Sequence, residues 1–378
     1  MKLAIIGAGP AGLYLAYLLK RARPETPIEV FEQNPPHATF GFGVVFSERA
    51  LEFLREEDEE TYAAVMPEME SWSDMTLDVQ GEVVCIDGIG FSAIGRLRLL
   101  ALLEARARSV GIRVRYGHSV RALDELAGAD LIVGADGVHS IVRHAHERAL
   151  GSRVDTLTNK FAWYGTTKRF ETLTQTFRRA AFGPINAHHY RYSPEMSTFL
   201  VETDASSWQR AGFETMDPQD TRACLEAVFA DVLQGHPLVS NQSVWRSFPV
   251  VRNERFSAGN AVLLGDALHT AHFSIGSGTR LAMEDAIALA HALEAPAQDP
   301  LAALQAYEAT RRPILEKLVV AAEASAAWYE RFGEHMELPP YELAMSYITR
   351  SGRVDVDRLR RTSPRFMEEY DRHRARRA

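Results

Sequence analysis

Apolar runs and helix-like segments alternate at the start of the chain. Residues 3–6 form a short, wholly apolar run that is typical of a buried strand. Residues 13–21 carry leucines at helical spacing, which indicates a helix directly after this strand. A second apolar run, at residues 28–32, ends on an acidic residue. This strand–helix–strand order predicts a Rossmann-like unit with parallel strands.

Two later segments show the same alternation of predicted strands and helices. A predicted helix over residues 96–110 precedes a segment of alternating apolar and basic residues at 112–116 and a mostly apolar run at 130–134. Further along, the run at residues 261–266 precedes a predicted helix over residues 281–293. Strands that alternate with helices favour one parallel sheet covered by helices, so we expect these segments to join the first unit.

The middle of the chain is different. Residues 153–249 are rich in aromatic and β-branched positions separated by turn residues, which predicts a second, mainly antiparallel sheet. The predicted fold class is therefore α/β: a Rossmann-like nucleotide-binding domain, an inserted, mainly antiparallel β-sheet domain that takes the substrate, and C-terminal helices. The expected boundaries are residues 1–71, 95–152 and 250–320 for the first domain, 72–94 and 153–249 for the second, and 321–378 for the helical segment.

A glycine-rich turn joins the first predicted strand to its helix. Gly7, Gly9 and Gly12 follow the Gly-x-Gly-x-x-Gly spacing, and such a turn presents backbone N–H groups and a helix N-terminus to a pyrophosphate. Glu32 stands twenty residues after Gly12, where a carboxylate can bind the hydroxyls of an adenosine ribose. With strand, helix and acid all in place, the sequence predicts dinucleotide binding rather than an ordinary turn.

Two more carboxylates follow predicted strands. Asp136 stands in a Gly-Ala-Asp-Gly segment and Asp266 ends the run at residues 261–266, so both belong to the sheet edge where ligands of α/β proteins bind. An alternative is that Asp136 only caps a tight turn. Gly276 and Gly278 then open the next helix, whose positive N-terminus suits the edge of a flavin ring that gains negative charge on reduction.

Composition narrows the class of protein. The 378 residues are 46% hydrophobic and carry a formal net charge of -8, which argues against a nucleic-acid partner. No apolar run approaches the roughly 20 residues that span a bilayer, so we expect no membrane segment. The N-terminal apolar run belongs to the glycine motif and not to a signal peptide. With two cysteines and no evident pairing between them, we expect a cytoplasmic protein.

These motifs resemble those of the single-component FAD-dependent aromatic hydroxylases, which share the p-hydroxybenzoate hydroxylase fold class. The resemblance covers essentially the whole chain and includes an arginine, Arg96, before the second helix. It implies noncovalent FAD, with NADH or NADPH as co-substrate and no second Rossmann domain for the nicotinamide. The residues expected at the cofactor are Gly7, Gly9, Ala11, Gly12, Glu32, Gly43, Val44, Arg96, Asp136, Asp266, Gly278, Thr279 and Arg280.

Three segments, residues 40–47, 161–168 and 269–279, look like the salicylyl-CoA 5-hydroxylases and the hydroxylase half of 2-aminobenzoyl-CoA monooxygenase/reductase, and residues 347–354 fit the same group. This likeness implies that the protein uses dioxygen to hydroxylate an activated aromatic ring through a flavin C4a-hydroperoxide. The implied substrate is an aryl-CoA thioester such as salicylyl-CoA, hydroxylated at its 5-position. Because the sequence ends at residue 378, we expect no coupled ring reductase in this polypeptide.

The resemblance also implies a substrate pocket between the two domains. One departure is that His272 and Phe273 stand where the wider class usually has prolines beside the flavin. Since the flavin carries the chemistry, we expect no catalytic nucleophile in the protein. We also expect no metal, although His188 and His189 are adjacent, because no third ligand has a convincing spacing. The expected pocket residues are Phe42, Val44, Trp163, His188, Tyr190 and Phe273, with ordinary core packing as the alternative for each.

Three other functions stay open at this point. The substrate can be a free aromatic compound, such as a tryptophan-derived or phenolic molecule. The scaffold also serves flavin-dependent halogenases or reductases, but the Trp-x-Trp-x-Ile segment of halogenases is absent from the sequence. A non-catalytic flavoprotein sensor would carry an interaction domain or a long charged linker, and the sequence contains neither.

Overall fold

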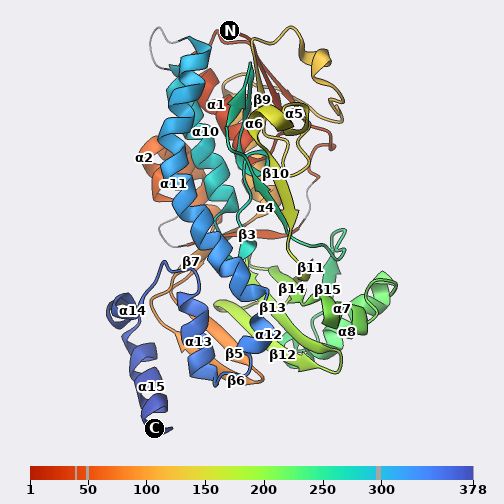
Figure 1. Ribbon diagram of the computed structural model, residues 1–378, viewed down its shortest axis with the longest axis vertical. Helices are drawn as coiled ribbons and strands as arrows, with labels where there is room; N and C mark the ends of the chain where they lie inside the picture. Colours follow the sequence, from red (N-terminus) through yellow and green to blue (C-terminus); the bar gives the residue numbers. More distant parts are fainter. Residues whose placement is uncertain (39–40, 48–50, 295–298, 378) are drawn as a thin grey trace.

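The predicted apolar runs form a mainly parallel sheet. The computed structural model describes residues 1–38, 41–47, 51–294 and 299–377 (Figure 1), so Phe40 of the first family-like segment lies outside the described residues. All neighbouring strands of this sheet pair in parallel except the first two. The strands are, in order across the sheet, β17 (Ser257–Ala258), β18 (Ala261–Leu263), β9 (Leu131–Gly134), β1 (Leu3–Ile6), β2 (Ile28–Phe31) and β8 (Val114–Arg115).

Three of the predicted helices cover this sheet. The helix α1 (Pro10–Ala22) is buried from Ala11 to Leu19, because it lies between the sheet, α4 (Arg96–Ser109) and α10 (Gly278–Glu294). The prediction that residues 13–21, 96–110 and 281–293 are helical is confirmed. The helix α11 (Pro300–Tyr329) packs on α10 and runs from the first sheet down to the second (Figure 1).

The middle of the chain forms the predicted second sheet. Its strand pairs are antiparallel apart from β5 with β12. The α/β fold class, with an antiparallel sheet beside a Rossmann-like one, is confirmed, whereas the exact domain boundaries stay a prediction. The strands are, in order, β15 (Leu238–Ser240), β11 (Lys160–Thr166), β14 (Ser197–Thr203), β13 (Gly183–Arg191), β12 (Leu173–Ala180), β5 (Met75–Val79) and β6 (Glu82–Ile86).

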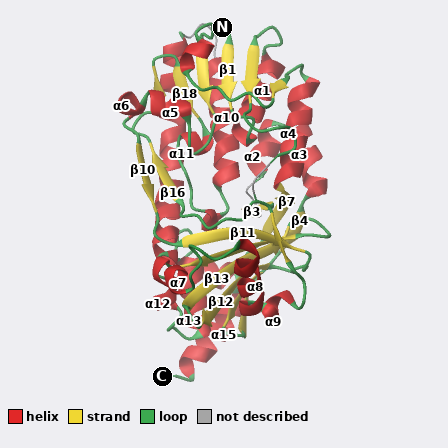
Figure 2. Ribbon diagram, turned by 90° about the vertical axis from the view of Figure 1, so that its right-hand side faces the viewer, coloured by secondary structure: helices red, strands yellow, loops and turns green. Residues whose placement is uncertain are grey.

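Two small sheets connect the large ones (Figure 2). One has the order β3 (Gly43–Ser47), β7 (Phe91–Gly95), β4 (Glu70–Trp72), and the other pairs β10 (Arg153–Thr156) with β16 (Pro249–Arg252). The remaining helices are α2 (Glu52–Glu57), α3 (Glu59–Val65), α5 (Ile141–Ala145), α6 (Glu147–Leu150), α7 (Ala205–Arg210), α8 (Pro218–Val228), α9 (Ala230–Leu233), α12 (Phe332–His335), α13 (Pro340–Thr349), α14 (Val356–Thr362) and α15 (Pro364–Ala375).

The C-terminal helices pack against the second sheet. Both α13 and α15 contact β6, and the Asp87 carboxylate accepts a hydrogen bond of 2.9 Å from the Phe366 N–H near the start of α15. Aromatic side chains fill this interface, with the Phe177 ring of β12 lying 6.1 Å from the Trp328 ring and 6.5 Å from the Tyr347 ring. The predicted helical segment is therefore part of the core around the second sheet.

A buried carboxylate connects α10 to its neighbours. Asp285 is fully buried and accepts hydrogen bonds from the Gly265 N–H at 3.0 Å, His269 Nε2 at 2.8 Å and Arg311 Nε at 2.6 Å. Burial raises the pKa of this carboxyl, but the His269 and Arg311 side chains outweigh it and lower the pKa to about 2. The carboxylate is therefore ionised at neutral pH, and it joins α10, α11 and the turn after β18.

We expect Asp285→Ala to lower the free energy of unfolding by about 3–5 kcal/mol, because buried Arg311 keeps only Glu284 as an ionic partner and the Gly265 N–H loses its acceptor. Urea unfolding monitored by circular dichroism measures this change. The matched control is Glu368→Ala, which removes an exposed partner of Arg372 and should change stability by less than about 1 kcal/mol. Equal effects of the two substitutions would contradict the central role of Asp285.

Candidate functional site

The three motif glycines differ in how much room a side chain would have at each position. Gly7 has a φ of +101°, and a Cβ there would come within 2.2 Å of the Ala135 carbonyl oxygen. A Cβ on Gly12 would lie 2.0 Å from the Gly7 carbonyl oxygen, so α1 can approach the turn only without a side chain. A Cβ on Gly9, the residue before α1, would meet nothing within 4 Å. Gly7 and Gly12 therefore allow close packing, whereas Gly9 faces open space at the start of α1, where an anion can approach.

This turn opens onto a recess at the carboxyl edge of the first sheet. The recess has a volume of about 140 Å³ and continues beside His37, Glu104 and Tyr116 into a groove of about 490 Å³. Its lining combines residues of the glycine turn, of the acidic end of β2 and of the start of α4, namely Ala8, Gly9, Leu13, Glu32, Asn34 and Arg96. The structure thus brings the glycine turn, the acid and the arginine together, as the sequence predicts.

Glu32 follows β2 and organises the recess. Its Oε2 accepts a hydrogen bond of 2.9 Å from the Ala8 N–H, and its Oε1 accepts from the Asn34 N–H and Nδ2 at 2.8 and 2.7 Å. An ionised carboxylate offers about four acceptor positions, so one remains for a ligand hydroxyl. The carboxylate has a structural role in addition to the predicted contact with ribose.

Arg96 and Asp266 lie near each other although 170 positions separate them in sequence. Arg96 starts α4, and its buried Nε finds no hydrogen-bond partner among the described residues. Burial lowers the pKa of the Arg96 guanidinium, and Asp266 opposes this effect. Asp266 itself is exposed, and the Arg96 and His269 side chains favour its ionised form. An unpartnered guanidinium N–H in this recess is suited to a phosphate oxygen.

Asp136 supports the turn after β9. Its Oδ2 accepts a hydrogen bond of 2.8 Å from the Ile141 N–H at the start of α5. Asp136 therefore caps this turn, which is the alternative role that the sequence left open. Its buried Oδ1 has no partner in the described part of the chain, which leaves a possible cofactor contact as a prediction. Arg143 connects this segment to the turn that contains Asp266, because its Nη1 donates to the Ala267 carbonyl at 3.0 Å.

The other end of the candidate cofactor site is the start of α10. This helix begins at Gly278, followed by Thr279 and Arg280, as the sequence predicts. A Cβ on Gly278 would meet nothing within 4 Å, whereas a Cβ on Gly276 would lie 3.2 Å from the Val45 side chain of β3. The predicted cofactor residues of β3 therefore lie close to the loop before α10.

Gly43 of β3 also binds the second sheet. Its N–H donates to Thr198 Oγ1 at 3.0 Å, and its carbonyl accepts from the Tyr190 hydroxyl at 2.9 Å. The strand that contains the predicted cofactor residues Gly43 and Val44 is thus fixed to the sheet that contains the predicted substrate residues. This contact sets the spacing between the two halves of the candidate site.

The predicted substrate residues gather on one face of the second sheet. Trp163, His188 and Tyr190 share this face by strand register, and a Cβ on Gly165 would overlap the Phe42 ring. The Phe273 ring lies 5.1 Å from that of Phe161. These contacts fit either a substrate wall or a packed core, so the pocket role stays a prediction.

Sequence reasoning assigned no role to Arg350, although it lies in a family-like segment. Its Nε donates to Ser325 Oγ at 2.9 Å and its Nη2 to the Ser274 carbonyl at 2.8 Å. Burial and the Arg350 charge lower the pKa of His188 and of His272 to about 3, so both rings are neutral at physiological pH. Only tertiary structure brings this arginine from α13 to the face of the sheet.

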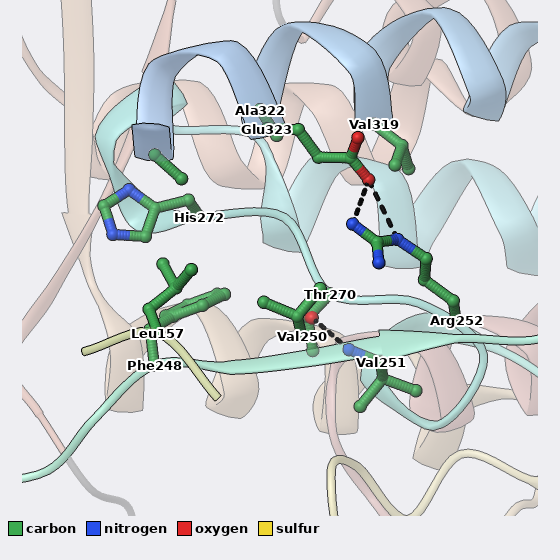
Figure 3. A pocket seen from close by; sticks show the side chains of 11 residues that line it. Leu157, Phe248, Val250, Val251, Arg252, Thr270, His272, Val319, Ala322 and Glu323 are labelled. Atoms are coloured by element: carbon green, nitrogen blue, oxygen red, sulfur yellow. Dashed lines mark hydrogen bonds and ion pairs between the residues drawn. The ribbon is translucent and has the colours of Figure 1, made fainter. Parts of the chain in front are cut away.

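A small cavity lies beside this region, under α11 (Figure 3). His272 and Phe248 stand at one end, and the ion pair between Arg252 and Glu323, at 2.5 Å, stands at the other. Its volume of about 20 Å³ suffices for one water molecule but not for an aromatic ring. We therefore exclude this cavity as the substrate site.

Two further findings concern metal and membrane. Among the described residues, no three His, Cys, Asp or Glu side chains come together as metal ligands would. No helix in the same part of the chain combines the length and apolarity that crossing a membrane requires.

The matching family model and the related proteins show that the chain is an FAD-dependent aromatic monooxygenase that uses NADH or NADPH. The chain belongs to the FAD binding domain family, whose model matches residues 1–322. The recess fits FAD, because it joins a helix N-terminus with an open glycine, a ribose-side carboxylate and an unpartnered arginine N–H. The resemblance inferred from the motifs is thereby confirmed.

Known proteins agree with this assignment. The chain is 42% identical to a salicyloyl-CoA 5-hydroxylase of Streptomyces sp, over 93% of this chain and 70% of that protein. It is 35% identical to a 3-hydroxy-4-methyl-anthranilyl-[aryl-carrier protein] 5-monooxygenase of Streptosporangium sibiricum, over 94% and 95% of the two chains. The solved structure of 2-methyl-3-hydroxypyridine-5-carboxylic acid oxygenase has the same fold, with a TM-score of 0.70 at 17% identity over 96% and 95% of the chains.

We expect Glu32→Ala to weaken FAD binding by about 1.5–3 kcal/mol, because a hydrogen bond to a charged group is lost. Titration of the FAD-depleted protein with FAD, followed by flavin fluorescence, measures the Kd. The control is Glu29→Ala on the same strand, whose carboxylate pairs with Lys2 at the surface and should leave the Kd unchanged. A wild-type protein that takes up no FAD would refute the whole site assignment.

Proposed function

We propose that the enzyme hydroxylates an aryl-CoA thioester whose ring carries a hydroxyl or amino group. Salicylyl-CoA, hydroxylated at its 5-position, is the preferred candidate. The observation that carries this proposal is the 42% identity to a salicyloyl-CoA 5-hydroxylase along nearly the whole chain. The family-like segments at residues 161–168 and 269–279 support it, since they contribute Trp163 and Phe273 to the region around the candidate substrate face.

The cofactor supplies the reactive oxygen, and the protein residues bind the cofactor and position the substrate. When bound, reduced FAD activates dioxygen and supplies the electrophilic oxygen atom. Gly9 and Arg96 would hold the phosphates of bound FAD, Glu32 would hold its ribose, and the N-terminus of α10 would stabilise negative charge on the flavin edge. The sheet face under β3 holds the ring and excludes water, which protects a reactive oxygen species from wasteful decay.

The ring must be activated for this reaction. An electrophilic oxygen attacks carbons that are electron-rich, and a hydroxyl or amino substituent enriches the positions ortho and para to it. In a salicyl ring the 5-position is para to the hydroxyl, so the proposed product follows from the electronics of the ring. The thioester arm must then extend out of the pocket toward cationic side chains that can bind its phosphates.

A second candidate is an aryl group carried as a thioester on a carrier protein. The 35% identity to an enzyme that acts on an anthranilyl group of an aryl-carrier protein favours it. A free aromatic acid or a tryptophan-derived compound is a further alternative outcome of the test below. We place the enzyme in the cytoplasm, a proposal supported by the two free cysteines, Cys85 and Cys224.

We expect the FAD-loaded enzyme to oxidise NADH or NADPH in the presence of salicylyl-CoA or 2-aminobenzoyl-CoA and to form the para-hydroxylated product. The kcat/KM for the thioester should exceed that for the free acid by at least about 100-fold, because remote binding energy is used to position the ring. Oxygen uptake and mass spectrometry of the product measure both quantities. Turnover of free salicylate or tryptophan with no turnover of any thioester would contradict the proposed substrate class.

A further inference from the structure

One face of the second sheet contains a concentration of buried polar atoms without partners. Strand register places Gln175 of β12 opposite His188 of β13, which in turn is opposite Leu200 of β14. Trp163 of β11 completes this row across the sheet. Within the described residues, no group hydrogen-bonds to Gln175 Oε1, Gln175 Nε2, His188 Nε2 or Trp163 Nε1.

Buried polar atoms without hydrogen-bond partners lower the stability of a folded protein. Gln175 has no exposed surface and His188 is 6% exposed, so water does not replace the missing hydrogen bonds freely. A buried polar group without a partner costs about 1–3 kcal/mol, and most native proteins have few of them. Several on one face therefore need an explanation, and a ligand that makes the missing hydrogen bonds is one.

The neighbouring row is partly paired, although Asn186 Oδ1 and Glu202 Oε2 also lack partners among the described residues. Asn186 and Glu202 face each other across β13 and β14, and each already has one partner, the Thr176 carbonyl at 3.2 Å and Asn159 Nδ2 at 2.9 Å. Burial raises the pKa of the Glu202 carboxyl to about 8, so at neutral pH this group carries a proton that it can donate. Gln175 and His188 face each other across β12 and β13, but within the described residues neither Gln175 side-chain atom nor His188 Nε2 has a hydrogen-bond partner.

The opposite face of β13 gives a direct contrast. His189 points away from His188, as alternation along a strand requires, and its Nε2 lies 2.9 Å from Thr176 Oγ1. Its ring also stacks on the Phe199 ring at 5.2 Å. The two adjacent histidines thus differ in environment: His189 is built into the core, whereas His188 is on the face that also contains Trp163 and Tyr190.

His188 and Gln175 present uncharged hydrogen-bonding groups on this face, because burial and the nearby Arg350 charge keep the His188 ring unprotonated. Arg350 lies close enough to His188 to disfavour its protonation, and His272 is neutral for the same reason. A neutral imidazole and a primary amide together offer both donors and acceptors, so they can bind a hydroxyl or an amino group.

We propose that Gln175 and His188 bind the hydroxyl or amino substituent of the aromatic ring and thereby fix which ring carbon meets the oxygen. This assignment rests on the proposed function, because it takes the ring of an aryl thioester as the ligand. It adds Gln175 to the expected pocket and gives His188 a defined positioning role. Both side chains act by orienting the ring.

Binding to the FAD-loaded enzyme tests this assignment with two ligands. Salicylyl-CoA carries the ring hydroxyl and benzoyl-CoA lacks it, and the flavin absorbance change on titration gives each Kd. We expect Gln175→Leu to weaken salicylyl-CoA binding at least tenfold, which equals about 1.4 kcal/mol, and to leave benzoyl-CoA binding unchanged. His188→Phe should give the same selective loss.

Thermal unfolding of the same proteins without substrate separates recognition from structure. Because Gln175→Leu removes unpartnered polar atoms, the Tm of the substrate-free holoenzyme should stay the same or rise. The matched control, His189→Phe, loses the contact with Thr176, so it should lower the Tm and leave both Kd values unchanged. Should Gln175→Leu fail to fold, Gln175→Met provides the same comparison with a flexible side chain.

The outcomes distinguish failure of the Gln175 and His188 assignment from failure of the proposed function. A lower Tm for Gln175→Leu with an unchanged ratio of the two Kd values would overturn the assignment and make Gln175 a structural residue. If the wild-type enzyme turns over aryl-CoA thioesters but binds salicylyl-CoA no better than benzoyl-CoA, the assignment also fails while the proposed function stands. If no aryl-CoA thioester is turned over, the proposed function itself fails.

Discussion

The buried carboxylate of Asp285 is the constraint on which the candidate cofactor site depends. A charge with no exposed surface is tolerated only when cations and N–H groups surround it, and here His269, Arg311 and the Gly265 N–H do so. These partners come from the turn after β18 and from α11, so the start of α10 is held against the same turn that contains Asp266. The position of the helix N-terminus relative to the recess is therefore fixed by an ion pair deep in the core.

The two halves of the site are connected mainly through β3. Gly43 is hydrogen-bonded to Thr198 and Tyr190 of the second sheet, while Val45 contacts the loop before α10. An extended strand transmits position well because its backbone is fixed on both sides. The spacing between the candidate cofactor residues and the predicted substrate face is consequently set by hydrogen bonds from the β3 backbone to the Thr198 and Tyr190 side chains, and fixed spacing of this kind is what orients reacting groups.

Local sequence patterns correctly predicted the features of the fold that depend on spacing along a single strand or helix. The glycine turn, the acid at position 32 and the helices that follow the apolar runs all appear where the sequence places them, because spacing along one strand or helix determines them. The pairing of Gln175 with His188 and the approach of Arg350 could not be predicted in this way. Both depend on strand register and on how α13 packs against the second sheet, and neither leaves a periodic signal in the sequence.

The alternation of His188 and His189 has a consequence for how this enzyme family can diversify. The hairpin of β12 and β13 closes with Ala180 opposite Gly183, and its short turn sets the register of every pair above it. A one-residue insertion or deletion within β13 would exchange the two histidines between the core and the ligand face. It would also shift the register between β13 and its neighbouring strands, so that the side chains now opposite one another would no longer meet. New ring specificities in this lineage should therefore arise by single replacements at fixed length, and length variation should be confined to the loops outside this hairpin.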